Sequence, residues 1–166
     1  MNALKTLIFT ILVPGTLAVL IPYRLAASPA ARGTIPLGGM RYFGLVFFAA
    51  GALIYLWCAW DFAVAGKGTP APIDPPKELV VRGPYKHIRN PMYVGVLSMV
   101  LGQAFWFEAA NLFIYAGVGF LLFNAFVFFY EEPALTRKFG PAYRRYCDAV
   151  PRWLPTLRRR QEAKYE

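Results

Sequence analysis

Long apolar blocks separated by short polar stretches dominate this chain. The blocks cover about residues 5–23, 42–64, 92–107 and 112–130. An apolar helix of about 20 residues crosses the hydrocarbon core of a bilayer, so the blocks predict about four transmembrane helices, the third of them short. Only four residues separate the last two blocks, which predicts a tight helical hairpin. With no strand pattern visible, we expect an all-α, polytopic membrane protein that forms one membrane-embedded domain over residues 1–166.

The first block has an alternative interpretation as a cleaved signal peptide. Small residues follow it at Ala26, Ala27 and Ala30, as they do at many cleavage sites. The apolar run is longer than a usual signal-peptide core, so we favour a retained span.

Two pairs of glycines are spaced seven residues apart. Gly44 and Gly51 lie on the second block, and Gly95 and Gly102 lie on the third. Seven residues make about two helical turns, so each pair falls on one helix face. Small faces allow helix backbones to approach closely in lipid, although glycine is also common in membrane helices for other reasons.

The segment after the fourth block predicts one or two amphipathic helices at the membrane surface, broken around Gly140 and Pro141. Its basic residues, such as Arg144 and Arg145, interleave with an apolar series. The members of that series are three or four residues apart: Leu135, Phe139, Tyr143, Tyr146, Val150 and Trp153.

The distribution of basic residues predicts the orientation in the membrane. With four spans, only Arg24, Arg32 and Arg41 of the 18 Lys and Arg residues lie on one side. The positive-inside rule therefore places both termini, the 65–91 loop and the 131–166 tail in the cytoplasm, as expected for an inner cell membrane protein.

Composition narrows the class of partner. The chain is 57% hydrophobic and 16% charged, with a net charge of +9. The charges lie between apolar blocks, so anionic membrane lipids, and not nucleic acid, are the expected partners. Cys58 and Cys147 are far apart and His87 is the one histidine, which argues against a zinc site or another metal centre. No phosphate-binding loop or dinucleotide fingerprint is present.

The end of the 65–91 loop is a first candidate site. Donors and aromatic rings, including Tyr85, His87 and Arg89, lie between the turns predicted at Gly83–Pro84 and Asn90–Pro91. Such a cluster could hold a polar cofactor at the membrane surface. The alternative is a basic, aromatic anchor at the interface.

Two adjacent acids, Glu131 and Glu132, are a second candidate site. They end a very apolar helix, where the helix dipole disfavours negative charge. They therefore need a compensating partner. The basic loop on the same side of the membrane can supply one, and a ligand's hydroxyls or a cationic centre can supply another.

These segments resemble the isoprenylcysteine carboxyl methyltransferases and their relatives, the phospholipid methyltransferases. The resemblance covers about residues 66–155 and is carried by ELVVRGPYKHIRNPMYVG, YEEP and FGPAYRRYCDAVPRWLP, in that order. It implies a pocket for S-adenosylmethionine. The cofactor-binding residues that it implies are Lys77, Glu78, Leu79, Val80, Tyr85, Asn90, Pro91, Met92, Tyr93 and Glu131, with Glu132 beside them.

Two positions depart from the family's pattern. Asn90 stands where the family often has histidine. Val127 stands where carboxyl-methylating members have an arginine for the acceptor carboxylate, which argues against an isoprenylcysteine acceptor.

The resulting hypothesis is methyl transfer from S-adenosylmethionine to a lipid-borne or amphipathic acceptor, either a carboxylate or an amine. Arg89 and Glu132 would orient the reactants, and His87 could accept a proton from an amine. Two alternatives stay open. One is an NADPH-dependent membrane reductase, because sterol reductases end in a similar pattern. The other is a noncatalytic lipid-binding module.

Overall fold

The computed structural model describes residues 12–28, 35–64 and 78–155, and these residues form helices and turns without a β-strand. The first helix covers Leu12–Ala27, with a π-helical turn η1 at Thr16–Leu20 followed by α2 at Ile21–Ala27. The remaining helices are η3 (Gly38–Tyr42), α3 (Phe43–Val64), η4 (Gly83–Lys86), α4 (Pro91–Trp106), α5 (Ala110–Phe126), η5 (Val127–Glu131), α6 (Glu132–Phe139) and α7 (Pro141–Ala149).

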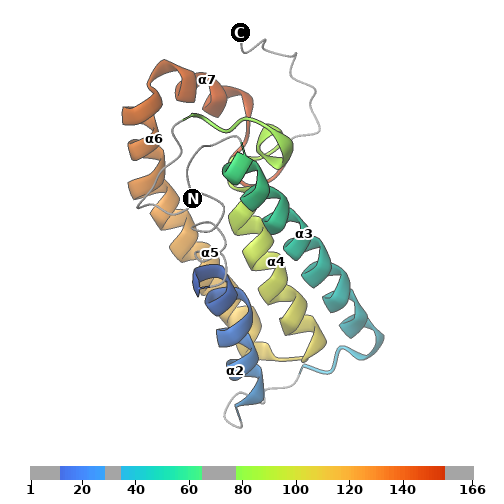
Figure 1. Ribbon diagram of the computed structural model, residues 1–166. Helices are drawn as coiled ribbons and strands as arrows, with labels where there is room; N and C mark the ends of the chain where they lie inside the picture. Colours follow the sequence, from blue (N-terminus) through green and yellow to red (C-terminus); the bar gives the residue numbers. More distant parts are fainter. Residues whose placement is uncertain (1–11, 29–34, 65–77, 156–166) are drawn as a thin grey trace.

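Among the described residues, two helices are long and apolar enough to cross a membrane, Gly38–Phe62 and Ala110–Phe139. Leu12–Ala27 and Pro91–Trp106 are apolar but shorter. The predicted second and third blocks correspond closely to α3 and α4. The helix of the fourth block continues past residue 130, because α5, η5 and α6 follow one another without a break (Figure 1).

The predicted glycine faces meet each other. A Cβ atom added to Gly51 would lie 2.6 Å from the carbonyl oxygen of Gly95, and one added to Gly95 would lie 2.8 Å from that of Gly51. Gly44 and Gly102 make the same reciprocal approach one heptad away. The spacing therefore marks the interface between α3 and α4, whose backbones pack in direct contact.

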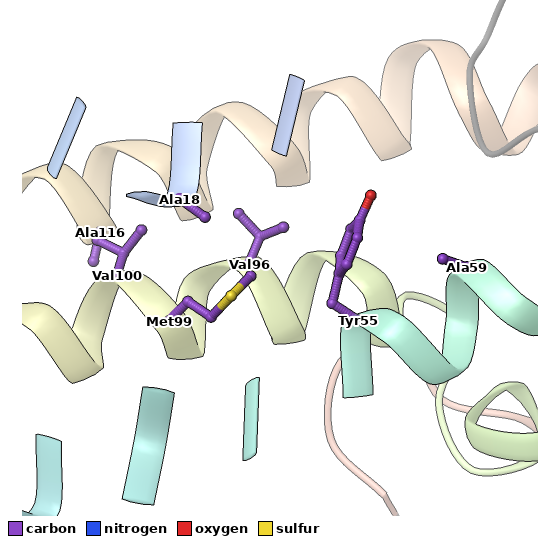
Figure 2. Packing of buried hydrophobic residues seen from close by; sticks show 7 residues of the cluster. All are labelled: Ala18, Tyr55, Ala59, Val96, Met99, Val100 and Ala116. Carbon is purple, nitrogen blue, oxygen red and sulfur yellow. The ribbon is translucent and has the colours of Figure 1, made fainter. Parts of the chain in front are cut away.

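The other side of α4 faces α5 and the first helix. The turn after Trp106 joins α4 to α5 as the predicted hairpin. Polar side chains fix the first helix to this pair: Gln103 Nε2 donates to Ala18 O at 2.5 Å and Tyr115 Oη donates to Leu17 O at 2.9 Å. In Figure 2, Val96 from α4 and the Tyr55 ring from α3 extend toward α5.

The two segments that carry the candidate site residues, the loop before α4 and the tail after residue 130, meet at the end of the molecule where α7 lies. The loop before α4 lies there beside α7 in Figure 1. Gly140 has a φ of +53°, which ends α6 and lets α7 begin at Pro141, as the predicted break requires. The apolar side of these helices, at Tyr143, Tyr146 and Val150, packs within the protein against Leu79 and Val81 of the loop. The described parts of the loop and of the tail thus pack against each other.

Candidate functional site

Hydrogen bonds hold the loop before α4 against α7 and the chain that follows it. Arg89 N donates to Pro151 O at 2.8 Å. Asn90 donates to Arg152 O from both its main-chain N at 3.3 Å and its side-chain Nδ2 at 3.2 Å. Further along, Tyr146 Oη donates to Tyr85 O at 2.8 Å. The position of the loop is therefore set by residues more than 60 positions later in the sequence.

The loop is also anchored to the end of α3. Gly83 has a φ of +54°, and a Cβ atom there would collide with Asp61 Oδ2 and with Trp57 Nε1, at 2.8 Å from the latter. Arg82 Nε lies 3.2 Å from Oδ1 of the buried Asp61. Glycine at position 83 thus meets both a backbone and a space requirement.

Glu132 is neutralised by two arginines. Its Oε1 accepts hydrogen bonds from Arg89 Nη1 and Arg152 Nε, each at 2.9 Å, and its Oε2 accepts one from Arg152 Nη2 at 2.8 Å. The side chain is 18% exposed, so this network lies largely out of water. The prediction that the basic loop compensates an acid is confirmed for Glu132, with Arg152 of the tail as a second partner.

Glu131 has a different partner. Tyr93 Oη donates to Glu131 Oε2 at 2.8 Å, and among the described residues no Lys or Arg forms an ion pair with this carboxylate. The acid sits in the π-helical turn η5, a kind of turn that is frequent at functional sites. The two neighbouring acids therefore differ in their partners: two arginines bind Glu132, whereas the hydroxyl of Tyr93 donates to Glu131.

Both carboxylates border a cavity of about 180 Å³, the polar cavity. A larger cavity of about 390 Å³, the middle cavity, continues from it toward the first helix. Both cavities are lined by Phe62, Tyr85, Arg89, Asn90, Tyr93, Phe126 and Glu131. The loop, the tail and the helices thus line two adjacent cavities.

Most of the predicted residues lie around this space. Leu79, Val80, Tyr85, Arg89, Asn90, Tyr93, Glu131 and Glu132 line the polar cavity, and Met92 lines the middle one. Three others, Glu78, His87 and Pro91, line neither cavity. Glu78 and His87 are exposed, whereas Pro91 is buried at the start of α4. Lys77 lies outside the described residues.

Sequence reasoning missed several residues of the site. Arg152, which donates two hydrogen bonds to Glu132, was not predicted as a site residue. Tyr143 and Tyr146, which line the polar cavity, were not predicted as site residues either. All three belong to the FGPAYRRYCDAVPRWLP segment that carries the resemblance. That segment was interpreted as one or two helices at the membrane surface. Its direct contact with the loop was not predicted.

Burial keeps the tyrosines of the loop and tail in their neutral form. It raises the pKa of the Tyr85 hydroxyl well above its ordinary value, and it raises the pKa of Tyr143 as well. The hydrogen bonds to Glu132 raise the pKa of Arg152, which stays charged. The polar cavity thus combines neutral hydroxyls, fixed guanidinium groups and one carboxylate without a basic partner among the described residues.

The residues around Arg89 pair only part of its guanidinium group. Arg89 Nη1 is engaged by Glu132 and by Cys147 Sγ, each at 2.9 Å. Arg89 Nε is buried and has no hydrogen-bond partner among the described residues. An unpaired buried donor is costly, so a bound acceptor atom at this position would be stabilising.

Comparison with known proteins gives two matches. A family model described as phospholipid methyltransferase matches residues 40–142, more than half of the chain. An uncharacterized protein of Haemophilus influenzae is 35% identical over 63 residues, which make up 38% of this chain and the whole of that relative. No solved structure matches the chain significantly. The family match includes Tyr93, Glu131 and Glu132 and ends within α7.

Proposed function

This chain belongs to the phospholipid methyltransferase family, and on that premise we propose that it is an integral membrane enzyme that transfers a methyl group from S-adenosylmethionine to a lipid-borne acceptor. The observation that carries the proposal is the 2.8 Å hydrogen bond between Tyr93 and Glu131. It joins the loop side and the tail side of one cavity, at two residues that the resemblance assigns to the cofactor.

We propose that four helices cross the membrane, with both ends of this chain and the 65–91 loop in the cytoplasm. The distribution of basic residues supports this orientation, which puts the polar cavity within reach of the cytoplasmic side of an inner cell membrane. Leu12–Ala27 and Pro91–Trp106 would serve as the two shorter spans. Exposed Arg137, Lys138, Arg144 and Arg145 would meet anionic lipid head groups from the polar side of α6 and α7.

The residues of the polar cavity suit the proposed cofactor by type. Glu131 would accept hydrogens from its amino group or its ribose, and Arg89 Nε would donate to its carboxylate. Tyr85 and Tyr93 would present ring faces, which attract a sulfonium cation. Leu79, Val80, Asn90 and Met92 would complete the walls, and Pro91 would fix the start of α4 beneath them.

Within the proposal, the protein contributes mainly alignment. S-adenosylmethionine, when bound, supplies a methyl group on a positively charged sulfur, which keeps the bond's electron pair as the acceptor atom bonds the methyl carbon. Holding the two reactants in line can lower the barrier by about 7 to 11 kcal/mol. The Arg89–Glu132–Arg152 network would hold the cavity wall in place for that alignment.

An amine is the acceptor that the cavity residues favour. Val127, at the position of the carboxylate-binding arginine in carboxyl-methylating relatives, is buried and lines the polar cavity. A neighbouring carboxylate, Glu131, would attract an ammonium group and repel an acidic one. Exposed His87 would then receive the amine's proton only through solvent, and not by direct contact.

The test is transfer of a labelled methyl group from S-adenosylmethionine into a native lipid extract by the purified protein. We expect label in the lipid fraction, in a product whose methylated atom is identified by mass spectrometry. Binding of S-adenosylmethionine and of NADPH should be measured in parallel by calorimetry. Binding of NADPH alone would contradict the proposal in favour of a reductase, and binding of neither would favour a noncatalytic lipid-binding module.

A further inference from the structure

The cavities do not end beside the carboxylates. Beyond the middle cavity lies a third one of about 250 Å³, the apolar cavity, between the first helix, α4 and α5. It shares Leu17, Val96, Leu122 and Phe123 with the middle cavity. The three cavities therefore lie one after another along α5, from Glu131 to Tyr115, and this row of cavities is called the groove.

The groove has the length of a hydrocarbon chain. From Tyr115 to Glu131 the helix advances by about 24 Å at 1.5 Å per residue. The bilayer core is about 30 Å thick, so the groove reaches past the middle of the membrane in the proposed orientation. A small water-soluble acceptor would leave most of this length empty.

The two ends of the groove differ in polarity. At one end Tyr93, Glu131 and Arg89 offer a carboxylate and buried donors. At the other end the hydroxyl of Tyr115 already donates to Leu17 O at 2.9 Å, and the rest of the lining is apolar apart from backbone. This arrangement complements an amphipathic molecule whose head lies at Glu131 and whose chain points toward Tyr115.

The rim of the groove is open to the surrounding lipid. Leu122 is 64% exposed and Val118 is 49% exposed, although both also line cavities. A chain that is anchored in the bilayer can therefore enter from the side, between the first helix and α5, without leaving the apolar phase.

Gly119 lies at the far part of the groove. A Cβ atom added there would meet Leu97 Cδ2 at 3.6 Å, an ordinary contact, and Leu97 itself lines the apolar cavity. A larger side chain at position 119 would thus fit the helix but extend into the cavity. Gly117, two residues earlier, is exposed, lines none of the three cavities and has nothing within 4 Å of an added Cβ.

We propose that the apolar cavity binds the terminal part of an acyl chain of the acceptor lipid, and that Gly119 sets the longest chain accepted. This inference rests on the proposed function for the identity of the lipid as acceptor. The groove itself rests on the cavities alone.

The experiment compares two phosphatidylethanolamines, dioctanoyl and dioleoyl, as probes. Their binding to the detergent-purified protein is measured by native mass spectrometry for the unmodified chain and for Gly119→Leu. We expect Gly119→Leu to weaken binding of the long-chain lipid by about tenfold, equal to about 1.4 kcal/mol, and to leave short-chain binding within about twofold. Gly119→Ala should produce a smaller shift in the same direction and, in a helix, should not impair folding.

Gly117→Leu is the matched control, because it adds the same side chain to the same helix outside the groove. It should leave the preference between the two lipids unchanged. Equal weakening of both lipids by Gly119→Leu, or no change in the preference in either Gly119 variant, would overturn the proposal.

Calorimetry with S-adenosylmethionine separates this inference from the proposed function. Gly119→Leu should bind the cofactor like the unmodified chain, because position 119 lies outside the polar cavity. A chain-length shift in a protein that does not bind S-adenosylmethionine would support the groove and contradict the methyltransferase. Cofactor binding without a chain-length shift would overturn the groove and be consistent with the methyltransferase.

Discussion

The two faces of α4 (Pro91–Trp106) are built in opposite ways. Toward α3, Gly95 and Gly102 bring the backbones into contact and leave no room for a single added carbon. Toward α5, Tyr93 and Val96 border adjacent cavities that share lining residues. One helix therefore has a closed face and an open face.

The difference separates stability from function. In lipid, helices gain little from burying apolar surface, so close backbone packing is an effective way to hold two of them together. The α3–α4 pair supplies that rigidity. It also carries the anchor of the loop, because Asp61 at the end of α3 contacts Arg82. The open face can then remain unfilled without loss of the fold.

Filling the closed face should have the largest effect. Gly51→Leu would force α3 away from α4, since even its Cβ would lie 2.6 Å from Gly95 O. We expect destabilisation by about 3 kcal/mol, which lowers the Tm in detergent by about 6 to 12 °C. Gly117→Leu, on the exposed side of α5, should leave the Tm nearly unchanged. Equal Tm values for both variants would disprove the closed interface.

Breaking the ion network at the open face should have the next largest effect. Glu132→Gln removes the charge shared by Arg89 and Arg152. We expect a loss of about 2 kcal/mol, seen as a Tm lower by about 4 to 8 °C. Arg145→Gln, at an exposed site on α7, is the control. An unchanged Tm together with lost cofactor binding would mean that Glu132 acts on the ligand and not on the fold.

The smallest effect is expected from removing one hydroxyl at the site. Tyr93→Phe deletes the donor to Glu131 while keeping the ring. S-adenosylmethionine binding should weaken by about fivefold, the value of one ordinary hydrogen bond of about 1 kcal/mol. Tyr115→Phe deletes a comparable hydroxyl at the far end of the groove and should leave cofactor binding unchanged. Similar losses in both variants would contradict a specific role of Tyr93.

The positions of the long helices were largely predictable, because long apolar runs in the sequence indicate apolar helices. The limits of α3 and α4 and the pairing of Gly44 and Gly51 with Gly102 and Gly95 follow from block length and heptad spacing. The end of the fourth helix was not predictable in this way. The change to polar residues at Glu131 suggested a stop, but the π-helical turn η5 leads directly into α6, and the helix continues past Pro133.

The site was predictable in part, for a different physical reason. The resemblance assigned Tyr85 and Asn90 of the loop to the cofactor, together with Glu131. The partners of Glu132 depend on contacts across the fold. Arg152 is 20 residues from Glu132, and Arg89 is 43 residues from it. Separations of this kind carry no periodic signal.

The most direct test of the central claim, that Glu131 is the ligand-facing acid of a single cavity, is calorimetric titration of Glu131→Gln with S-adenosylmethionine. The substitution keeps the side chain's size and removes its charge. We predict binding at least about tenfold weaker than in the unmodified chain, because a hydrogen bond to a charged group contributes about 1.5 to 3 kcal/mol, with little change in Tm. Unchanged affinity in a folded Glu131→Gln protein would contradict the claim.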